Sequence, residues 1–331
     1  MRALQITGPN TYEIVEMSDP VPGSGEVLIR VRACTICNQH ESKMFAGPHG
    51  KYPCIPGWPG HEGAGEVIAL GPGVSRLVVG DRVVMRGPSG GGAPLHRELV
   101  TRPEGSVVKY ESDVSFEEAA PMELYGCVYR AVNKASSVRD RRAAVVGLGP
   151  AGLVCCQLLV ALGAAEITAV DFVEDRLALA AHCGATNTIN ASRFEAIPEI
   201  LEMNARGAET GSLSELYKKE LKALAPLVVD CSGSARSLQT SFVLAAEELV
   251  VFGYTVDPVT AYTPVWFERE LTIRNSKVLS HDDFRAVTTL MDEGRIHPGR
   301  LISTKMPFSA YGEAIAAIRA HQAIKIALTW D

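Results

Sequence analysis

The stretch that decides the fold runs from residue 143 to residue 165 and reads AAVVGLGPAGLVCCQLLVALGAA. It carries no charged residue and is long enough to span a bilayer. Three glycines and a proline, however, divide it into a short β-branched run and a separate helical run. These are Gly147, Gly149, Pro150 and Gly152. We therefore interpret the stretch as a buried strand, a tight turn and a helix, and we reject a membrane span.

The three glycines have the spacing G-x-G-x-x-G directly after the apolar strand. Gly147 would permit the tight turn, Gly149 would let a pyrophosphate approach the backbone, and Gly152 would allow close packing of helix on strand. The helix N-terminus, beginning at Pro150 and Ala151, would offer amide donors and partial positive charge. The motif predicts a dinucleotide site, and an ordinary βα turn without a ligand is the alternative.

A second strand follows and ends at Asp171, 24 residues beyond the first glycine, close to the spacing of about 20 residues typical of this motif. Its carboxylate would accept hydrogen bonds from the adenosine ribose and repel a 2′-phosphate, which favours NAD over NADP. Arg176 could lie beside the same ribose. A solvated carboxylate at a strand end is the alternative for Asp171.

Around this stretch, apolar strands alternate with helical segments, which indicates a parallel sheet with crossover helices. We expect a doubly wound α/β domain of about six strands: AAVVGL, EITAVD, TNTIN, LVVDCS, ELVVFGY and ELTIRNS. The charged, glycine-interrupted segment 192–222 is long for one crossover, so we expect a surface insertion there.

The first hundred or so residues have a different texture. Short alternating runs such as EVLIRVRA, GAGEVIAL and DRVVMRG, separated by Gly, Pro and Asp, predict antiparallel strands. A helical stretch follows from about residue 115. The tail is helical after residue 281 and ends in a strand, KIALTW, which could return to the N-terminal β domain.

The bulk properties fit a packed protein of two domains. The 331 residues exceed the usual length of one domain, and the 47% hydrophobic content predicts a sizeable core. The net charge of −6 gives no reason to expect nucleic acid as a partner. Eight cysteines in a chain this long favour reduced thiols in a cytoplasm over a disulfide scaffold. The N-terminal residues lack an apolar run, so we expect no secretory signal.

Three residues in the N-terminal half are candidate metal ligands. Cys37 follows a strand in RACTICNQHES, and His61 and Glu62 lie in PGWPGHEGAGEV. They can offer a thiolate, an imidazole and a carboxylate to zinc. Cys34 and Cys37 form a single C-x-x-C, which makes a zinc ribbon improbable. Taken alone, a buried cysteine and a structural histidine would explain Cys37 and His61 equally well.

Taken together, these motifs resemble the zinc-dependent alcohol and polyol dehydrogenase branch of the medium-chain dehydrogenase/reductase superfamily. The resemblance covers nearly the whole chain. Besides the glycine loop and the Cys37 segment, it rests on PVPGSGEVLIRVRA, GHE, GDRV, SFEEAAPME and VVDCSG, in that order. It implies a GroES-like β domain, residues 1–123 and 275–331, and a Rossmann domain, residues 124–274.

The resemblance also implies the roles of individual residues. Cys37, His61, Glu62 and Glu123 match the ligands of one catalytic zinc per chain, and the glutamate at position 123 leans towards polyol-like substrates, as in relatives of sorbitol and threonine dehydrogenases. The alternative for Glu123 is a helix-dipole contact in a first turn. Lys325 matches a basic residue that reaches the cofactor pyrophosphate, with a solvated surface lysine as the alternative.

Two departures from the family pattern are visible. The segment after GDRV has no cysteines, so we expect no structural zinc. Gln39 stands where the family usually has a hydroxyl that starts a proton relay, and it cannot titrate. His40 stands where an aspartate usually supports the metal-bound histidine. It could take part in the relay, bind substrate or fill a polar gap.

The activity implied is NAD-linked hydride transfer from a secondary alcohol or polyol, or back to the ketone, with zinc polarising the substrate oxygen. Two alternatives stay open, namely a zinc-free NADPH quinone or enone reductase of the same superfamily and a catalytically silent NAD-binding protein. The family also implies a homodimer or homotetramer.

Overall fold

The structure is a computed structural model that describes residues 1–47, 51–87, 94–194, 223–261 and 263–330. Contacts divide the chain into two compact units, Met1–Gly126 with Ser280–Asp331, and Cys127–Leu279. Among the described helices, none combines the length and the apolar character needed to cross a membrane. Most of the expected insertion, residues 195–222, lies outside the described residues.

The second unit is built on a six-stranded parallel sheet with the order β10-β9-β8-β11-β12-β13. Its strands are β8 (Arg142–Val146), β9 (Glu166–Asp171), β10 (Asn187–Asn190), β11 (Ala225–Asp230), β12 (Ala245–Val251) and β13 (Thr272–Asn275). All six expected strands are present, and the order reverses beside β8, as in a doubly wound fold. The expected Rossmann architecture is confirmed.

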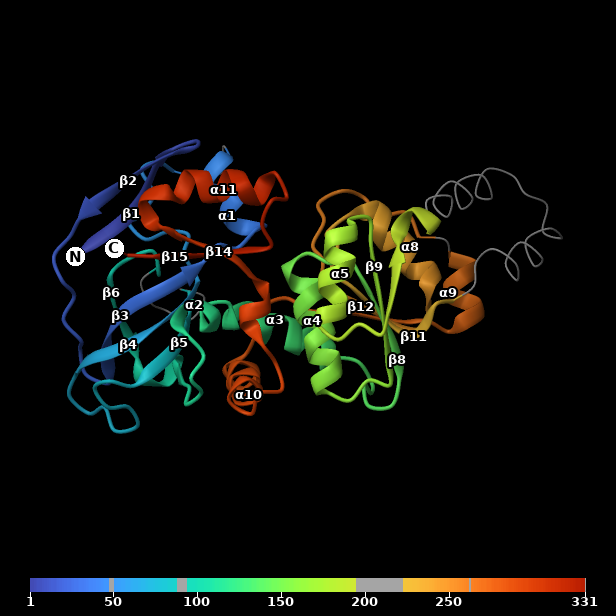
Figure 1. Cartoon of the computed structure of the whole chain (residues 1–331), viewed down its shortest axis with the longest axis horizontal. Coiled ribbons are helices and arrows are strands. Elements are labelled where there is room, and N and C mark those ends of the chain that lie inside the picture. The colour runs from blue at the N-terminus through green and yellow to red at the C-terminus, as the bar shows by residue number, and fades with distance from the viewer. Residues whose placement is uncertain (48–50, 88–93, 195–222, 262, 331) are drawn as a thin grey trace. The chain divides into compact units, whose positions relative to one another are not determined.

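Helices cover both faces of this sheet. Figure 1 shows α4 (Pro150–Ala161) and α5 (Glu174–His182) on one side, and α8 (Ala235–Leu244) and α9 (Thr263–Arg269) on the other. Nine of the twelve residues of α4 are buried, from Gly152 to Leu159 and Ala161. That burial explains why the stretch 143–165 lacks charge, because its strand and its helix both lie in the core.

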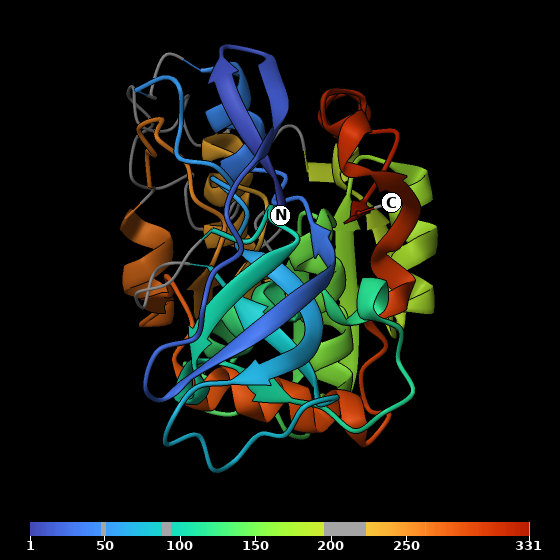
Figure 2. The same cartoon turned by 90° about the vertical axis from the view of Figure 1, so that its left-hand side faces the viewer.

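The first unit contains a seven-stranded sheet with the order β14-β15-β3-β4-β5-β7, in which β6 also pairs with β3. Figure 2 shows its curved blue and cyan strands. The seven strands of the sheet are β3 (Glu26–Thr35), β4 (Glu62–Leu70), β5 (Arg82–Arg86), β6 (Leu99–Pro103), β7 (Val108–Lys109), β14 (Ile302–Pro307) and β15 (Lys325–Thr329). The expected antiparallel runs EVLIRVRA, GAGEVIAL and DRVVMRG form β3, β4 and β5. The tail strand joins them as β15, antiparallel to β3.

Smaller elements complete the first unit. A hairpin of β1 (Arg2–Gly8) and β2 (Thr11–Glu16) stands apart as a two-stranded sheet. The helices are α1 (His40–Ala46), α2 (Phe116–Ala119), α3 (Met122–Val132), α10 (His281–Asp292) and α11 (Tyr311–Arg319), with 3-10 turns at Glu104–Ser106, Pro298–Leu301 and Phe308–Ala310. The end of α3 belongs to the second unit, which also has a 3-10 turn at Ala191–Phe194.

Candidate active site

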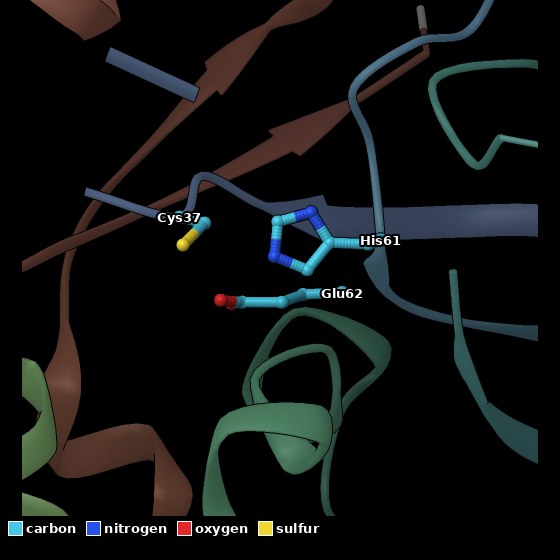
Figure 3. Close-up of side chains that lie close together, drawn as sticks. All are labelled: Cys37, His61 and Glu62. Carbon is cyan, nitrogen blue, oxygen red and sulfur yellow. The ribbon is translucent and has the colours of Figure 1, made fainter. Parts of the chain in front are cut away.

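Three side chains of the first unit converge at one end of β3 and β4. Ligand atoms of Cys37, His61 and Glu62 all lie within 4.8 Å of one another. Figure 3 shows the sulfur, the ring and the carboxylate facing a common space. Ligands about 2.0–2.3 Å from one zinc ion lie roughly 3.3–3.8 Å apart in a tetrahedral site, so small side-chain movements would bring all three donors to one ion. The three donors therefore fit a single zinc ion by both type and spacing.

Cys37 lies in the loop between β3 and α1. The backbone N–H of Ile36 donates to Ile326 O at 3.3 Å, and the Lys325 ammonium donates to Ile36 O at 2.8 Å. The C-terminal strand β15 therefore fixes the residue that precedes the thiol. The Cys37 carbonyl accepts the N–H of Glu41 at 3.0 Å, which closes the turn into α1.

His61 directly precedes β4, and its backbone carbonyl accepts the N–H of Gly87 at 2.8 Å. Its Nδ1 lies 2.8 Å from the carbonyl oxygen of Pro59. Burial disfavours protonation of this imidazole, but the Cys37 side chain and the charge of Glu123 outweigh it and raise the pKa of His61. The surroundings of the ring therefore attract positive charge, which suits a cation site.

Glu62 begins β4 and has a buried ion pair. The ammonium of Lys325 donates to its two oxygens at 2.7 and 2.5 Å, and both side chains are only 1% exposed. The hydroxyl of Thr35, opposite Glu62 in the β3–β4 pairing, donates to it as well. Burial lowers the pKa of Lys325, but the charges of Glu62 and Cys37 and the hydrogen bond to Glu62 outweigh it, so the pKa is raised. Lys325 therefore competes with any metal for this carboxylate.

The position of Lys325 rules out one of the two expectations stated above. Its ammonium is buried beside Glu62, so the interpretation as a solvated surface lysine is wrong. Its contact with a cofactor pyrophosphate stays a prediction.

The remaining expected site residues lie around this trio. Glu123, in the first turn of α3, is outside the group of mutually close ligand atoms, but its charge raises the pKa of His61. The ring of His40 lies 5.4 Å from that of His61, edge to face, and partial burial together with the charge of His61 lowers the pKa of His40. Gln39 is exposed at the start of α1.

Sequence reasoning missed a second group of polar residues next to the trio. Glu41 is fully buried, and its Oε1 lies 3.8 Å from His61 Nδ1. Burial raises the pKa of Glu41 to about 7. His96 is also fully buried, and burial together with the charge of His61 lowers its pKa to about 3. An acidic residue inside an otherwise amphipathic helix is a common surface feature, so only the fold reveals Glu41.

The second unit contains the glycine loop between β8 and α4. Gly147 has φ +86°, and a Cβ there would meet Ser232 Cα at 2.6 Å. A Cβ on Gly152 would lie 2.0 Å from the carbonyl oxygen of Gly147, whereas a Cβ on Gly149 would meet nothing within 4 Å. Two of the glycines thus pack the loop, while Gly149 leaves open space in front of the N-terminus of α4. Pro150 and Ala151 form the first turn of that helix.

Asp171 ends β9 and is buried, so it is not a solvated carboxylate at a strand end. Its Oδ2 accepts the N–H of Leu148, inside the glycine loop, at 2.6 Å, and its Oδ1 accepts the N–H of Val173 at 2.9 Å. Arg176 Nη1 lies 3.8 Å from Asp171 Oδ2. The carboxylate therefore holds the loop in place and lies beside the expected arginine.

Two family descriptions match the chain. Residues 23–111 match "Alcohol dehydrogenase GroES-like domain" and residues 150–293 match "Zinc-binding dehydrogenase". Together they cover more than half of the chain. The first match includes Cys37, His61 and Glu62, and the second begins at the N-terminus of α4.

The chain is also similar to individual proteins named as dehydrogenases or reductases of alcohols and polyols. A protein of Neosartorya fischeri named "Probable D-xylulose reductase A" is 27% identical, over 94% of this chain and 90% of its own length. An alcohol dehydrogenase of Geobacillus stearothermophilus is 31% identical over 57% of this chain and 63% of its own. The crystal structure of 2R,3R-butanediol dehydrogenase from Bacillus subtilis superposes with a TM-score of 0.81, at 23% identity, over 100% of this chain and 99% of that one.

Proposed function

The chain belongs to the zinc-dependent branch of the medium-chain dehydrogenase/reductase family, and we propose that it is an NAD-dependent dehydrogenase of secondary alcohols or polyols. Cyclitols, sugar alcohols and amino alcohols are the candidate substrates. The observation that carries the proposal is the convergence of Cys37, His61 and Glu62, whose donor types and spacing suit one zinc ion. Matching relatives named for D-xylulose and for alcohols support this substrate class.

The chain's own residues would divide the work as follows. Cys37 and His61 would hold the metal, with Glu62 or Glu123 as the carboxylate ligand. When bound, zinc supplies Lewis-acid polarisation of the substrate oxygen. Gln39 and His40 lie next to the metal ligands in sequence, so we assign them to substrate orientation. Because Gln39 cannot titrate, His40 is the side chain of this pair that could accept a proton.

The cofactor would be held by the glycine loop. The open space at Gly149 and the amides at the N-terminus of α4 suit a pyrophosphate. Asp171 and Arg176 would lie at the ribose, where a carboxylate disfavours a 2′-phosphate and so supports NAD over NADP. Lys325 is a candidate for a second contact with the pyrophosphate, which would require it to leave Glu62.

Metal analysis and NAD reduction with a panel of secondary alcohols and polyols test this proposal. We expect one zinc per chain and turnover with at least one polyol. Cys37→Ala should abolish zinc retention and activity while the Kd for NAD stays near that of the parent. Activity with NADPH and enones in metal-free protein would instead identify a zinc-free reductase. NAD binding without turnover across the panel would indicate a silent binding protein.

We also propose an oligomeric assembly and a cellular location. We propose a homodimer or homotetramer formed through the edge of the Rossmann sheet, because β13 is an edge strand whose four residues are all exposed. All eight cysteines are free thiols. Free thiols fit a reducing compartment, so we propose a cytoplasmic location. Sedimentation analysis would measure the subunit number.

A further inference from the structure

A buried carboxylate lies directly behind two of the metal-ligand residues. Glu41 is on α1, one helical turn after Cys37, and is 0% exposed. Its Oε1 accepts the backbone N–H of Cys37 at 3.2 Å and lies 3.8 Å from Nδ1 of His61. One oxygen atom therefore faces both the thiol-bearing residue and the imidazole.

The other oxygen of Glu41 is held from the opposite side. The hydroxyl of Tyr311, the first residue of α11, donates to Oε2 at 3.2 Å, and Nε2 of His96 lies 3.5 Å from the same atom. The His96 ring packs edge to face against Phe308 and Tyr311, with ring centroids 5.3 and 5.5 Å away. Tyr311 therefore anchors Oε2 by a hydrogen bond, while the His96 ring is packed beside it without one.

The backbone leaves room for His96 at one particular place. A Cβ on Gly60 would lie 2.3 Å from Cδ2 of His96, so only glycine fits beside this ring. Gly60 is the residue before His61. The glycine that precedes the metal-ligand histidine thus also allows the buried imidazole to reach Glu41.

The buried carboxylate of Glu41 has imidazoles, not lysine or arginine side chains, as its neighbours at ion-pair distance among the described residues. Among the described residues, no lysine or arginine lies within ion-pair distance of its oxygens, and the only ion-pair contacts are with the two imidazoles. A buried carboxylate is costly unless hydrogen bonds and a positive charge compensate for the lost water. On the side of Cys37 and His61, a metal cation would supply that charge.

We propose that Glu41 is a positioning residue for the metal centre, fixing the Cys37 backbone and facing the His61 imidazole, with the Tyr311 hydroxyl holding its carboxylate and His96 packed beside it. This inference rests on the proposed function, since it concerns the same metal. Groups that orient metal ligands typically change metal affinity by about 10–100-fold when removed. Glu41 would also connect the ligand loop to α11, far away in the sequence.

The test compares zinc affinity in the parent and in Glu41→Gln, which keeps the shape of the side chain but removes its charge. Competition against a chelator of known affinity should show zinc bound about 10–100-fold more weakly. The visible bands of the cobalt(II)-substituted protein should change in position or intensity, because they report ligand geometry. A matched control is Glu248→Gln, a buried carboxylate of the second unit, which should leave both readouts unchanged.

A milder variant covers the case in which Glu41→Gln does not fold. Tyr311→Phe removes only the hydroxyl that holds Oε2, and we expect zinc affinity to fall several-fold with an altered cobalt spectrum. The proposal for Glu41 is overturned if each of these two variants that folds binds zinc as tightly as the parent and has the parent's cobalt spectrum. If the parent itself binds no zinc, the proposed function fails instead, so the two failures are distinguishable.

Discussion

Replacing Lys325 with methionine tests the buried ion pair beside the metal ligands. The ammonium donates to both oxygens of Glu62 and to the carbonyl oxygen of Ile36, and all of these contacts would be lost. Glu62, 1% exposed, would keep the Thr35 hydroxyl but have no counter-charge. Removing one partner of a buried pair costs about 3–5 kcal/mol. We expect Lys325→Met to lower the free energy of unfolding of the metal-free protein by that amount.

Calorimetry or urea unfolding of the metal-free protein would measure the loss. In a domain of this size each kcal/mol corresponds to about 2–4 °C, so the first unit should unfold roughly 6–20 °C lower. Adding zinc should restore part of the loss, because Glu62 would then be free to meet the cation.

Two further variants make the result specific. Lys305→Met removes an ammonium that is 56% exposed and pairs with Glu117 at 2.9 Å, and it should cost less than about 1 kcal/mol. The double variant Glu62→Gln/Lys325→Met buries no unpaired charge and should recover most of the stability. Stability of Lys325→Met within 1 kcal/mol of the parent would refute the reasoning.

Four other outcomes are expected. Hydrogen bonds from Arg141 and Ser136 outweigh burial and lower the pKa of Glu248 from 4.5 to about 2. The stabilisation that Glu248 provides should therefore be complete above pH 4.5 and lost as the pH falls towards 2. Acid-unfolding curves should show the free energy of unfolding decrease by roughly 2–3 kcal/mol over this range, and the decrease should be smaller in Glu248→Gln. Asp171→Ala should lower the affinity for NAD about tenfold in fluorescence titrations, since a charged hydrogen bond contributes about 1.5–3 kcal/mol. It should also reduce the ratio of NAD affinity to NADP affinity, and an unchanged ratio would contradict this prediction. Gly152→Ala, with its Cβ 2.0 Å from a backbone oxygen, should lower the unfolding temperature and abolish NAD binding. Gly149→Ala should weaken NAD binding while leaving the unfolding temperature unchanged.

Much of the fold could be predicted because its signals are local. The apolar run before Gly147 and the apolar helix after Gly152 have their own periodicities, and all six strands of the parallel sheet follow from similar runs. The spacing of the glycines depends on one turn, so it marks the loop without knowledge of any other segment. Cys37 and His61 could be predicted as candidate metal ligands for a related reason, because few residue types can bind zinc.

The contacts around those ligands depend on segments far apart in the chain. Lys325 meets Glu62 because β15 pairs with β3 and β3 pairs with β4, and a shift of one residue would turn either side chain to the opposite face. Glu41, His96 and Tyr311 meet only where α1, the residues before β6 and α11 pack together. Sequence periodicity determines which face of an element is buried, whereas only the register and packing of remote elements determine which buried polar groups touch.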